Sequence, residues 1–115
     1  MTLDGIRMVV CVSDAGTDPR LDETFARCAA FAVFTATGEL EGVVENRARN
    51  AAGAASTQAA TQLRELGAGA VVAAKYGPNA VGVLERAGIR AYRCPEPVTA
   101  REARRRALAG ELATD

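Results

Sequence analysis

Three cysteines and the complete lack of histidine limit the chemistry that this chain can do. The cysteines are Cys11, Cys28 and Cys94, and no two of them form a Cys-x-x-Cys pair. Without histidine there is no Ser-His-Asp triad, no Cys-His dyad and no imidazole metal ligand, and the cysteine spacing does not suit a structural zinc site. The odd count argues against a disulfide scaffold, and the first residues, which do not resemble a secretory signal, lead to the same expectation. We therefore expect reduced thiols and a cytoplasmic protein, with Cys11 in the core because it lies in an apolar run.

Small and polar residues follow the first predicted strand and precede two predicted helices. Ligands of mostly parallel sheets bind outside the carboxyl ends of the strands, so residues 14–27, 51–57 and 75–79 are expected to meet there. Two helix N-termini would direct free N–H groups at one cleft, which favours an anionic ligand. The alternative is that the Ser, Thr and Asn side chains merely cap the helices. The candidate binding residues in these segments are Asp14, Arg27, Gly53, Ser56, Thr57, Lys75, Gly77 and Asn79.

The glycines do not form a known nucleotide-binding loop. Gly67 and Gly69 precede a predicted strand, whereas a dinucleotide-binding fingerprint follows one, and no Gly-x-x-x-x-Gly-Lys-Ser/Thr sequence occurs. Neither motif is therefore expected to position the anion.

The pattern of apolar residues predicts the elements that would hold these segments. Strands are predicted over 6–13, 31–35, 39–45, 70–74 and 89–93, and helices over 54–66, 77–87 and 99–108, while 21–29 is ambiguous. The first run is apolar almost throughout, which is typical of a central strand covered on both faces. The order βββαβαβα, with right-handed crossovers, predicts a three-layer α/β fold with one antiparallel strand contributed by a hairpin. A chain of 115 residues is expected to form a single domain, 1–115.

Several residues are expected to mark the helix ends. Gly67 and Gly88 would end the first two helices. Pro78 would stand in the first turn of the second helix. Thr99 would begin the third helix as the first residue of a capping box.

The composition excludes some classes of binding partner. Basic and acidic residues number 14 each, apolar residues make up 49% and aromatic residues 4%, which is an ordinary globular balance. The zero net charge argues against a nucleic-acid partner, and no apolar run approaches the roughly 20 residues of a membrane span. We expect a monomer or weak homodimer that binds neither nucleic acid nor membrane.

The order of the motifs resembles one known family. The segment Leu21-Asp22-Glu23-Thr24-Phe25-Ala26-Arg27, followed by Phe31, resembles the Ser-Glu-His-Phe-Gly-Arg segment of the dinitrogenase iron-molybdenum cofactor biosynthesis family, the NifX-like carriers. Further matches are Asn46, the small residues up to Gln58, Gly77-Pro78-Asn79-Ala80 before Leu84 and Ala87-Gly88-Ile89, and the segment from Val98 to Ala103. The resemblance covers nearly the whole chain, and Gly-Pro-Asn-Ala is its most specific element.

The resemblance implies both a fold and a role. The fold is a ribonuclease-H-like three-layer motif with a mixed five-stranded sheet, strand order 3-2-1-4-5, strand 2 antiparallel, and about three helices. The role is not enzymatic: the family binds or carries iron-sulfur or iron-molybdenum cluster precursors for nitrogen fixation and works with cofactor-assembly proteins. It also implies that Phe25 and Arg27 face the binding pocket.

This sequence departs from the family pattern in the first loop. Thr24 stands where the family has histidine, and Ala26 stands where it has glycine. The change at Thr24 removes an imidazole that could bind a cluster metal. Cys28 lies four residues later and could replace it, because thiolate suits iron-sulfur chemistry. The alternative is that Cys28 is a small buried apolar residue.

Two other functions compete with the carrier. A regulatory or interaction module without a cluster would use the basic stripe of the last helix, Arg101, Arg104, Arg105 and Arg106. A two-metal nuclease needs several converging carboxylates. Asp14 ends the first strand, but no acids follow the fourth and fifth strands, so nuclease activity is not expected.

Overall fold

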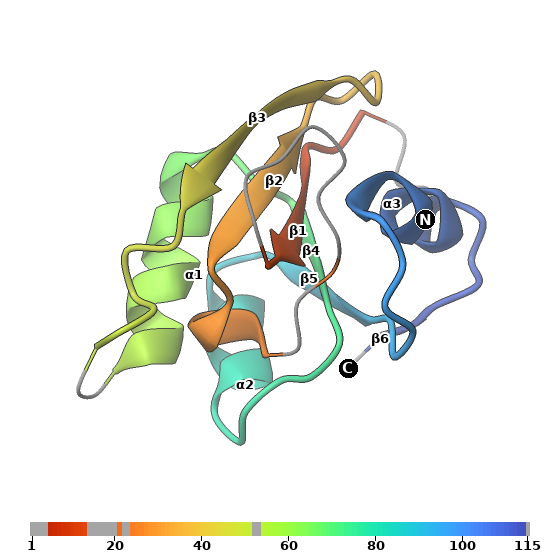
Figure 1. The fold of residues 1–115 in the computed structure, drawn as a ribbon. Helices are drawn as coiled ribbons and strands as arrows, with labels where there is room; N and C mark the ends of the chain where they lie inside the picture. Colours follow the sequence, from red (N-terminus) through yellow and green to blue (C-terminus); the bar gives the residue numbers. More distant parts are fainter. Residues whose placement is uncertain (1–4, 14–20, 22–23, 52–53, 115) are drawn as a thin grey trace.

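The chain folds into a mixed sheet with helices on both faces (Figure 1). The computed structural model describes residues 5–13, 21, 24–51 and 54–114. The strands are β1 (Met8–Val12), β2 (Ala30–Phe34), β3 (Leu40–Glu45), β4 (Ala70–Ala73), β5 (Arg90–Arg93) and β6 (Ala113–Thr114). The helices are α1 (Ala55–Glu65), α2 (Ala80–Arg86) and α3 (Ala100–Leu108), and the ambiguous stretch before β2 contains a 3-10 turn, η1 (Phe25–Arg27).

The sheet has the strand order β3-β2-β1-β4-β5-β6. Strand β1 is antiparallel to β2 and parallel to β4, and β4 is parallel to β5. These pairings confirm the predicted order 3-2-1-4-5 and the antiparallel second strand. The sixth strand was not predicted, because β6 has only 2 residues and so carries no readable alternation of apolar and polar side chains. It pairs with β5 and extends the sheet at that edge.

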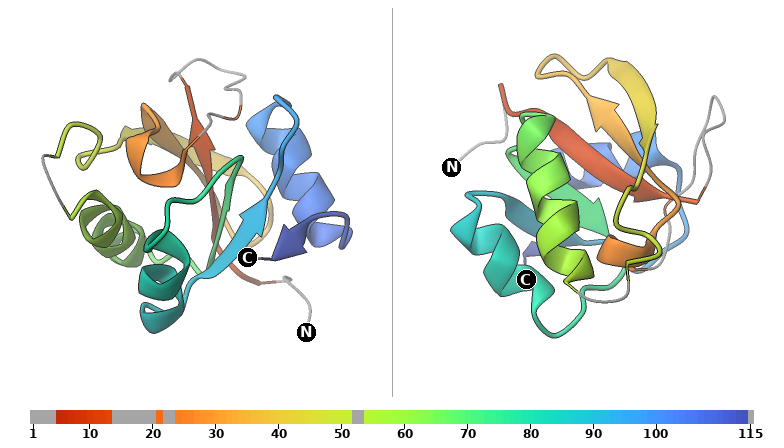
Figure 2. Two further views of the ribbon diagram at one scale, coloured as in Figure 1. Left: turned by 90° about the horizontal axis from the view of Figure 1, so that it is seen from below. Right: turned by 90° about the vertical axis from the view of Figure 1, so that its left-hand side faces the viewer.

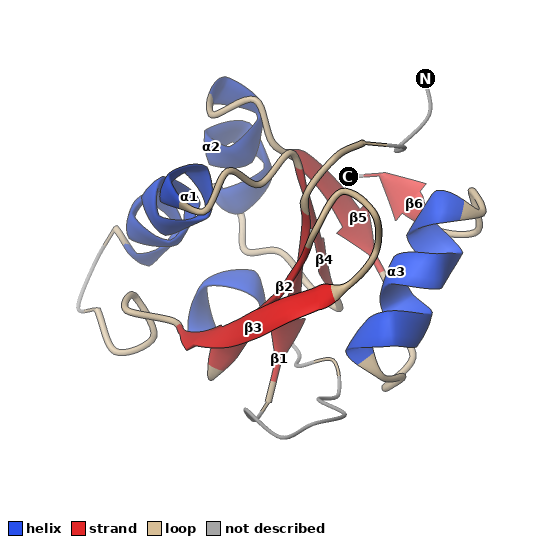
Figure 3. Cartoon of the chain, turned by 90° about the horizontal axis from the view of Figure 1, so that it is seen from above, coloured by secondary structure: helices blue, strands red, loops and turns tan. Residues whose placement is uncertain are grey.

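Strand β1 explains why the fold has three layers. Successive side chains of a strand point to opposite faces, and here both sets are buried: Val9 and Cys11 on one face, Val10 and Val12 on the other. Helices α1 and α2 cover the first face and α3 covers the second (Figures 2 and 3). A strand apolar on both sides is therefore the centre of the predicted three-layer motif.

The helix ends agree with the sequence in all but one place. Gly67 and Gly88 adopt positive φ angles of 75° and 77° after α1 and α2, as predicted. The hydroxyl of Thr99 accepts a hydrogen bond from the Glu102 N–H at 3.2 Å, as expected of a helix cap. The expected position of Pro78 is wrong, because α2 begins only at Ala80, after a turn. Among the described helices, none is both long and apolar enough to cross a bilayer.

Candidate functional site

A pocket of about 330 Å³ lies where η1 meets the starts of α1 and α2. Five of the predicted binding residues contribute to its wall: Arg27, Ser56, Thr57, Gly77 and Asn79. The remaining wall residues are Thr24, Ala26, Ala54, Ala55, Pro78 and Val83. The structure therefore brings together three segments that lie 20 or more positions apart in the sequence. Of the three other residues expected from the loops, Asp14 and Gly53 lie outside the described residues, and Lys75 is discussed below.

Helix α1 begins at this pocket without a side-chain cap. Its N-cap residue is Ala54, which has no side-chain acceptor and adopts a left-handed conformation with φ of 56°. Alanine at this position costs about 1 kcal/mol relative to a serine or aspartate cap. The first intrahelical bond runs from the Gln58 N–H to the Ala54 carbonyl, so the preceding N–H groups have no carbonyl of an earlier helical turn to bond. Ser56 and Thr57 stand inside the helix and do not cap it, so no described side chain caps its N-terminal end.

Arg27 supplies positive charge to the pocket and also holds its rim. The Nη1 group donates hydrogen bonds to the carbonyls of Arg49 and Ala51 at 3.0 and 2.9 Å. These carbonyl acceptors carry no charge that would offset the guanidinium, and the two bonds connect η1 to the loop before α1. Arg27 therefore lines the pocket, as predicted, and also holds the loop before α1 in place, which the sequence did not predict.

Asn46 fixes the same loop from inside the protein. Its side chain is 2% exposed. The Nδ2 group donates to the carbonyls of Ala26 and Cys28 at 3.0 and 2.9 Å, and Oδ1 accepts from the Ala48 N–H at 2.9 Å. In the sequence, Asn46 matches the family order and otherwise predicts only a turn, as an asparagine at the start of a loop usually does. Only the tertiary structure shows it satisfying three buried backbone groups.

Phe25 and Lys75 do not lie where they were expected. Phe25 is fully buried, with its ring centroid 5.9 Å from Tyr76 and 6.4 Å from Phe31. It supports the pocket from beneath instead of facing it, because a large ring gains more by burial in the core. Lys75 is exposed and does not line the pocket, but its carbonyl accepts the Phe25 N–H at 3.0 Å. The hydroxyl of Tyr76 donates to the Tyr92 carbonyl at 2.6 Å and so anchors the loop after β4.

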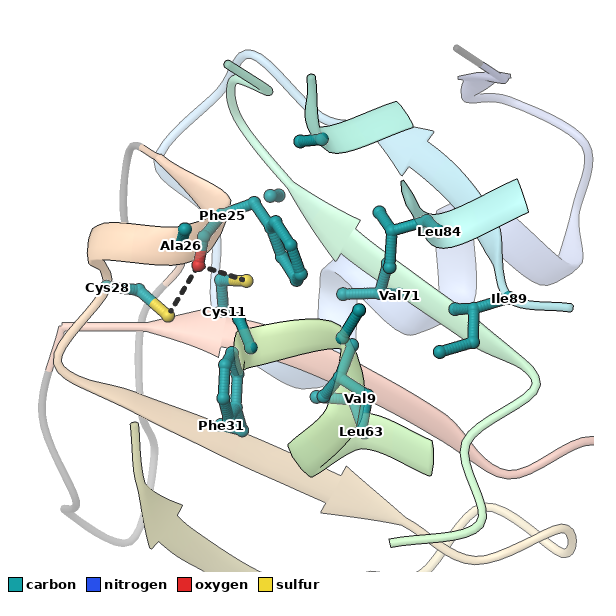
Figure 4. Close-up of a cluster of buried hydrophobic side chains, with 14 of the residues drawn as sticks. Val9, Cys11, Phe25, Ala26, Cys28, Phe31, Leu63, Val71, Leu84 and Ile89 are labelled. Atoms are coloured by element: carbon teal, nitrogen blue, oxygen red, sulfur yellow. Dashed lines mark hydrogen bonds between the residues drawn. The ribbon is translucent and has the colours of Figure 1, made fainter. Parts of the chain in front are cut away.

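The position of Cys28 does not suit the predicted metal ligand. The thiol is 1% exposed and donates to the carbonyls of Phe25 and Ala30 at 3.3 and 3.4 Å. Cys11 donates to the same Phe25 carbonyl at 3.7 Å, as Figure 4 shows. Both sulfurs therefore belong to the core, as expected for Cys11, and the buried alternative holds for Cys28. Within the described part of the chain, no group of three or more His, Cys, Asp or Glu side chains is placed to hold a metal ion.

The arginines of α3 are largely occupied within the chain. Arg105 forms ion pairs with Glu102 and Glu111, and Arg106 pairs with Glu102 and Glu96. The guanidinium of Arg104 lies 5.9 Å from the centre of the Phe34 ring. The predicted basic stripe therefore offers a partner much less free charge than its sequence suggests.

Comparison with known proteins gives one family and several similar folds. A family model described as "Dinitrogenase iron-molybdenum cofactor" matches residues 7–110. The apo form of the orange protein from Desulfovibrio gigas is 32% identical, with a TM-score of 0.86 over 95% of this chain and 92% of that chain. The Thermotoga protein TM1290, a candidate NifB protein of the DUF35 family, is 27% identical, with a TM-score of 0.79 over 95% and 92%.

A curated relative matches over a shorter stretch. The uncharacterized protein MJ0580 of Methanocaldococcus jannaschii is 31% identical over 77 residues, which are 64% of this chain and 65% of that protein. The match therefore spans just under two thirds of the relative's own length. Its name assigns no activity.

Proposed function

This chain belongs to the dinitrogenase iron-molybdenum cofactor family, and from that premise we propose that it is a non-enzymatic carrier of an anionic iron-sulfur-type cofactor precursor. The cargo would occupy the pocket between η1, α1 and α2 and pass to or from cofactor-assembly proteins in the cytoplasm. Membership in the family supports a cofactor-related role, and the pocket supports an anionic guest.

The observation that carries the proposal is the uncapped N-terminus of α1 in the pocket wall. A helix N-terminus carries about half a positive charge, and its free N–H groups bind anions directly. Arg27 adds a full charge to the same wall. None of the described wall residues is acidic, so a negatively charged cluster would meet attraction from this surface.

The proposed mode of binding is hydrogen bonding and not metal coordination. The described wall residues include no cysteine and no carboxylate, and Cys28 is turned into the core. Sulfide atoms at the edge of a cluster would accept hydrogen bonds from backbone N–H groups and from the hydroxyls of Ser56 and Thr57. Such contacts are individually weak and reversible, which suits a protein that takes up cargo and releases it.

A pair of neighbouring substitutions tests the proposal. Thr57→Glu places a carboxylate on the pocket wall, whereas Gln58→Glu places one a residue further along α1, outside the described wall. Both carboxylates lie in the first turn and interact equally well with the helix dipole, so the stability of the two variants should be alike. The chain would be incubated anaerobically with ferrous iron, sulfide and a thiol, passed through gel filtration, and assayed for iron and visible absorption.

The expected result is retention of iron by the wild type and by Gln58→Glu, with at least a fivefold loss in Thr57→Glu. A fivefold loss corresponds to about 1 kcal/mol of repulsion between like charges, a modest value for partly exposed groups. Equal retention by the two variants would show that the cargo binds elsewhere. No retention by the wild type would remove the carrier function.

A further inference from the structure

We propose that the groove between α1 and α2 is a docking site for an acidic, partly apolar segment of a protein that exchanges cargo with the pocket. The docking surface itself is inferred from the groove alone. Its part in cargo exchange rests on the proposed function.

The groove continues directly from the pocket. It has a volume of about 200 Å³ and is lined by Thr57, Ala60, Thr61 and Arg64 of α1 and by Val83, Arg86 and Ala87 of α2. Thr57 and Val83 also line the pocket, so a segment in the groove would end at the pocket's edge. The two helices lie side by side on one face of the sheet (Figure 3).

Arg64 and Arg86 give the groove a positive charge that no described residue compensates. Both side chains are exposed, and neither makes a hydrogen bond or ion pair with a described residue. None of the described residues that line the groove is acidic. By contrast, Arg7 and Arg47 are paired with Glu41 and Glu65. The groove thus places together two arginines that have no partner among the described residues.

The floor of the groove indicates the kind of segment that would fit. Ala60 is buried, Ala87 and Val83 are half-buried, and their short side chains leave an apolar depression between the arginines. A peptide that places an apolar side chain on this floor and carboxylates on either side would match both features. Single-stranded nucleic acid would find no stacking surface, because none of the described groove residues is aromatic.

The test is a titration of the ligand-free, ¹⁵N-labelled full chain with a nine-residue amidated peptide of glutamate and leucine, followed by NMR. The double variant Arg64→Gln/Arg86→Gln removes both positive charges from the groove. Arg101→Gln is the matched control, because Arg101 is an exposed arginine on α3, across the sheet from the groove. A lysine–leucine peptide and a thymidine oligonucleotide serve as control ligands.

We expect the acidic peptide to shift the amide signals of the groove residues and the double variant to weaken its binding at least fivefold, a loss typical of two exposed ion pairs. Arg101→Gln should bind as the wild type does. Shifts centred on α3, equal binding of the lysine peptide, or tighter binding of the oligonucleotide at the same residues would overturn the proposal.

A second measurement separates docking from cargo binding. The double variant should retain as much iron as the wild type in the anaerobic assay, because its arginines lie outside the pocket wall. Loss of iron retention would show that the groove belongs to the cargo site and would overturn docking. Absence of iron in both proteins would refute the carrier function while the peptide result still stands.

Discussion

Replacing Asn46 with alanine should destabilise the whole protein and loosen the pocket, because one side chain satisfies three buried backbone groups. The substitution leaves the carbonyls of Ala26 and Cys28 and the N–H of Ala48 without their partner. A buried polar group that loses its hydrogen bond costs about 1–3 kcal/mol. Taking the lower end of that range for each group, since water can enter the vacated space, gives a loss of about 3 kcal/mol.

Urea unfolding followed by circular dichroism measures this loss. With an m-value of about 1.5 kcal/mol per molar urea, the midpoint should fall by about 2 M. Asn46→Asp keeps the volume and the acceptor facing Ala48 but removes both donors, so it should also be strongly destabilised. This variant separates the loss of hydrogen bonds from the creation of a cavity.

Asn50→Ala is the control, since Asn50 is exposed in the same loop, and its effect should stay within about 0.5 kcal/mol. If Asn46→Ala lowered the free energy of unfolding by less than about 1 kcal/mol, the assigned role of Asn46 in joining η1 to the loop would be wrong. The same variant should also retain less iron in the anaerobic assay, because η1 carries part of the pocket wall.

The remaining predictions concern a charge network, a close contact and a thiol. Hydrogen bonding from Arg105 lowers the pKa of Glu102 from 4.5 to about 2. The ionised carboxylate therefore stabilises the folded state fully above pH 4.5, and this stabilisation should be lost as the pH falls toward 2. The difference in stability between the wild type and Glu102→Gln should shrink over that range in urea titrations. Gly69→Ala would place a Cβ 2.6 Å from Cγ2 of Ile6 and should cost about 1–3 kcal/mol in urea unfolding. Cys28→Ala should leave the iron retained per chain unchanged, because the thiol points into the core.

Each of these predictions has a control or a contrary outcome. For Gly69, the control is Gly42→Ala, since a Cβ at Gly42 meets no atom within 4 Å and should be nearly neutral. A stability difference for Glu102→Gln that stays constant down to pH 2 would contradict the assigned hydrogen bonds. Loss of iron in Cys28→Ala, at unchanged stability, would restore Cys28 as a ligand.

Much of the fold could be predicted from the sequence because it depends on local patterns of residues. The apolar run around β1 is typical of a strand buried on both faces, and that predicted its place at the centre of the sheet. Gly67 ended α1 where a left-handed residue was needed. Strand β6 was not predicted, because two residues show no periodicity. Its existence depends on pairing with β5.

The sequence by itself determined which segments would form the pocket, because chain order and strand direction place the loops of a parallel sheet at one edge. It could not determine which way individual side chains turn. Phe25 and Cys28 were candidate contacts with the ligand, yet both turned inward, where burial of a ring and of a thiol stabilises the core. Only the tertiary structure decided that the N-cap of α1, Ala54, makes no side-chain hydrogen bond and that Arg64 and Arg86 find no partner among the described residues. Those properties depend on distances between elements that no local pattern specifies.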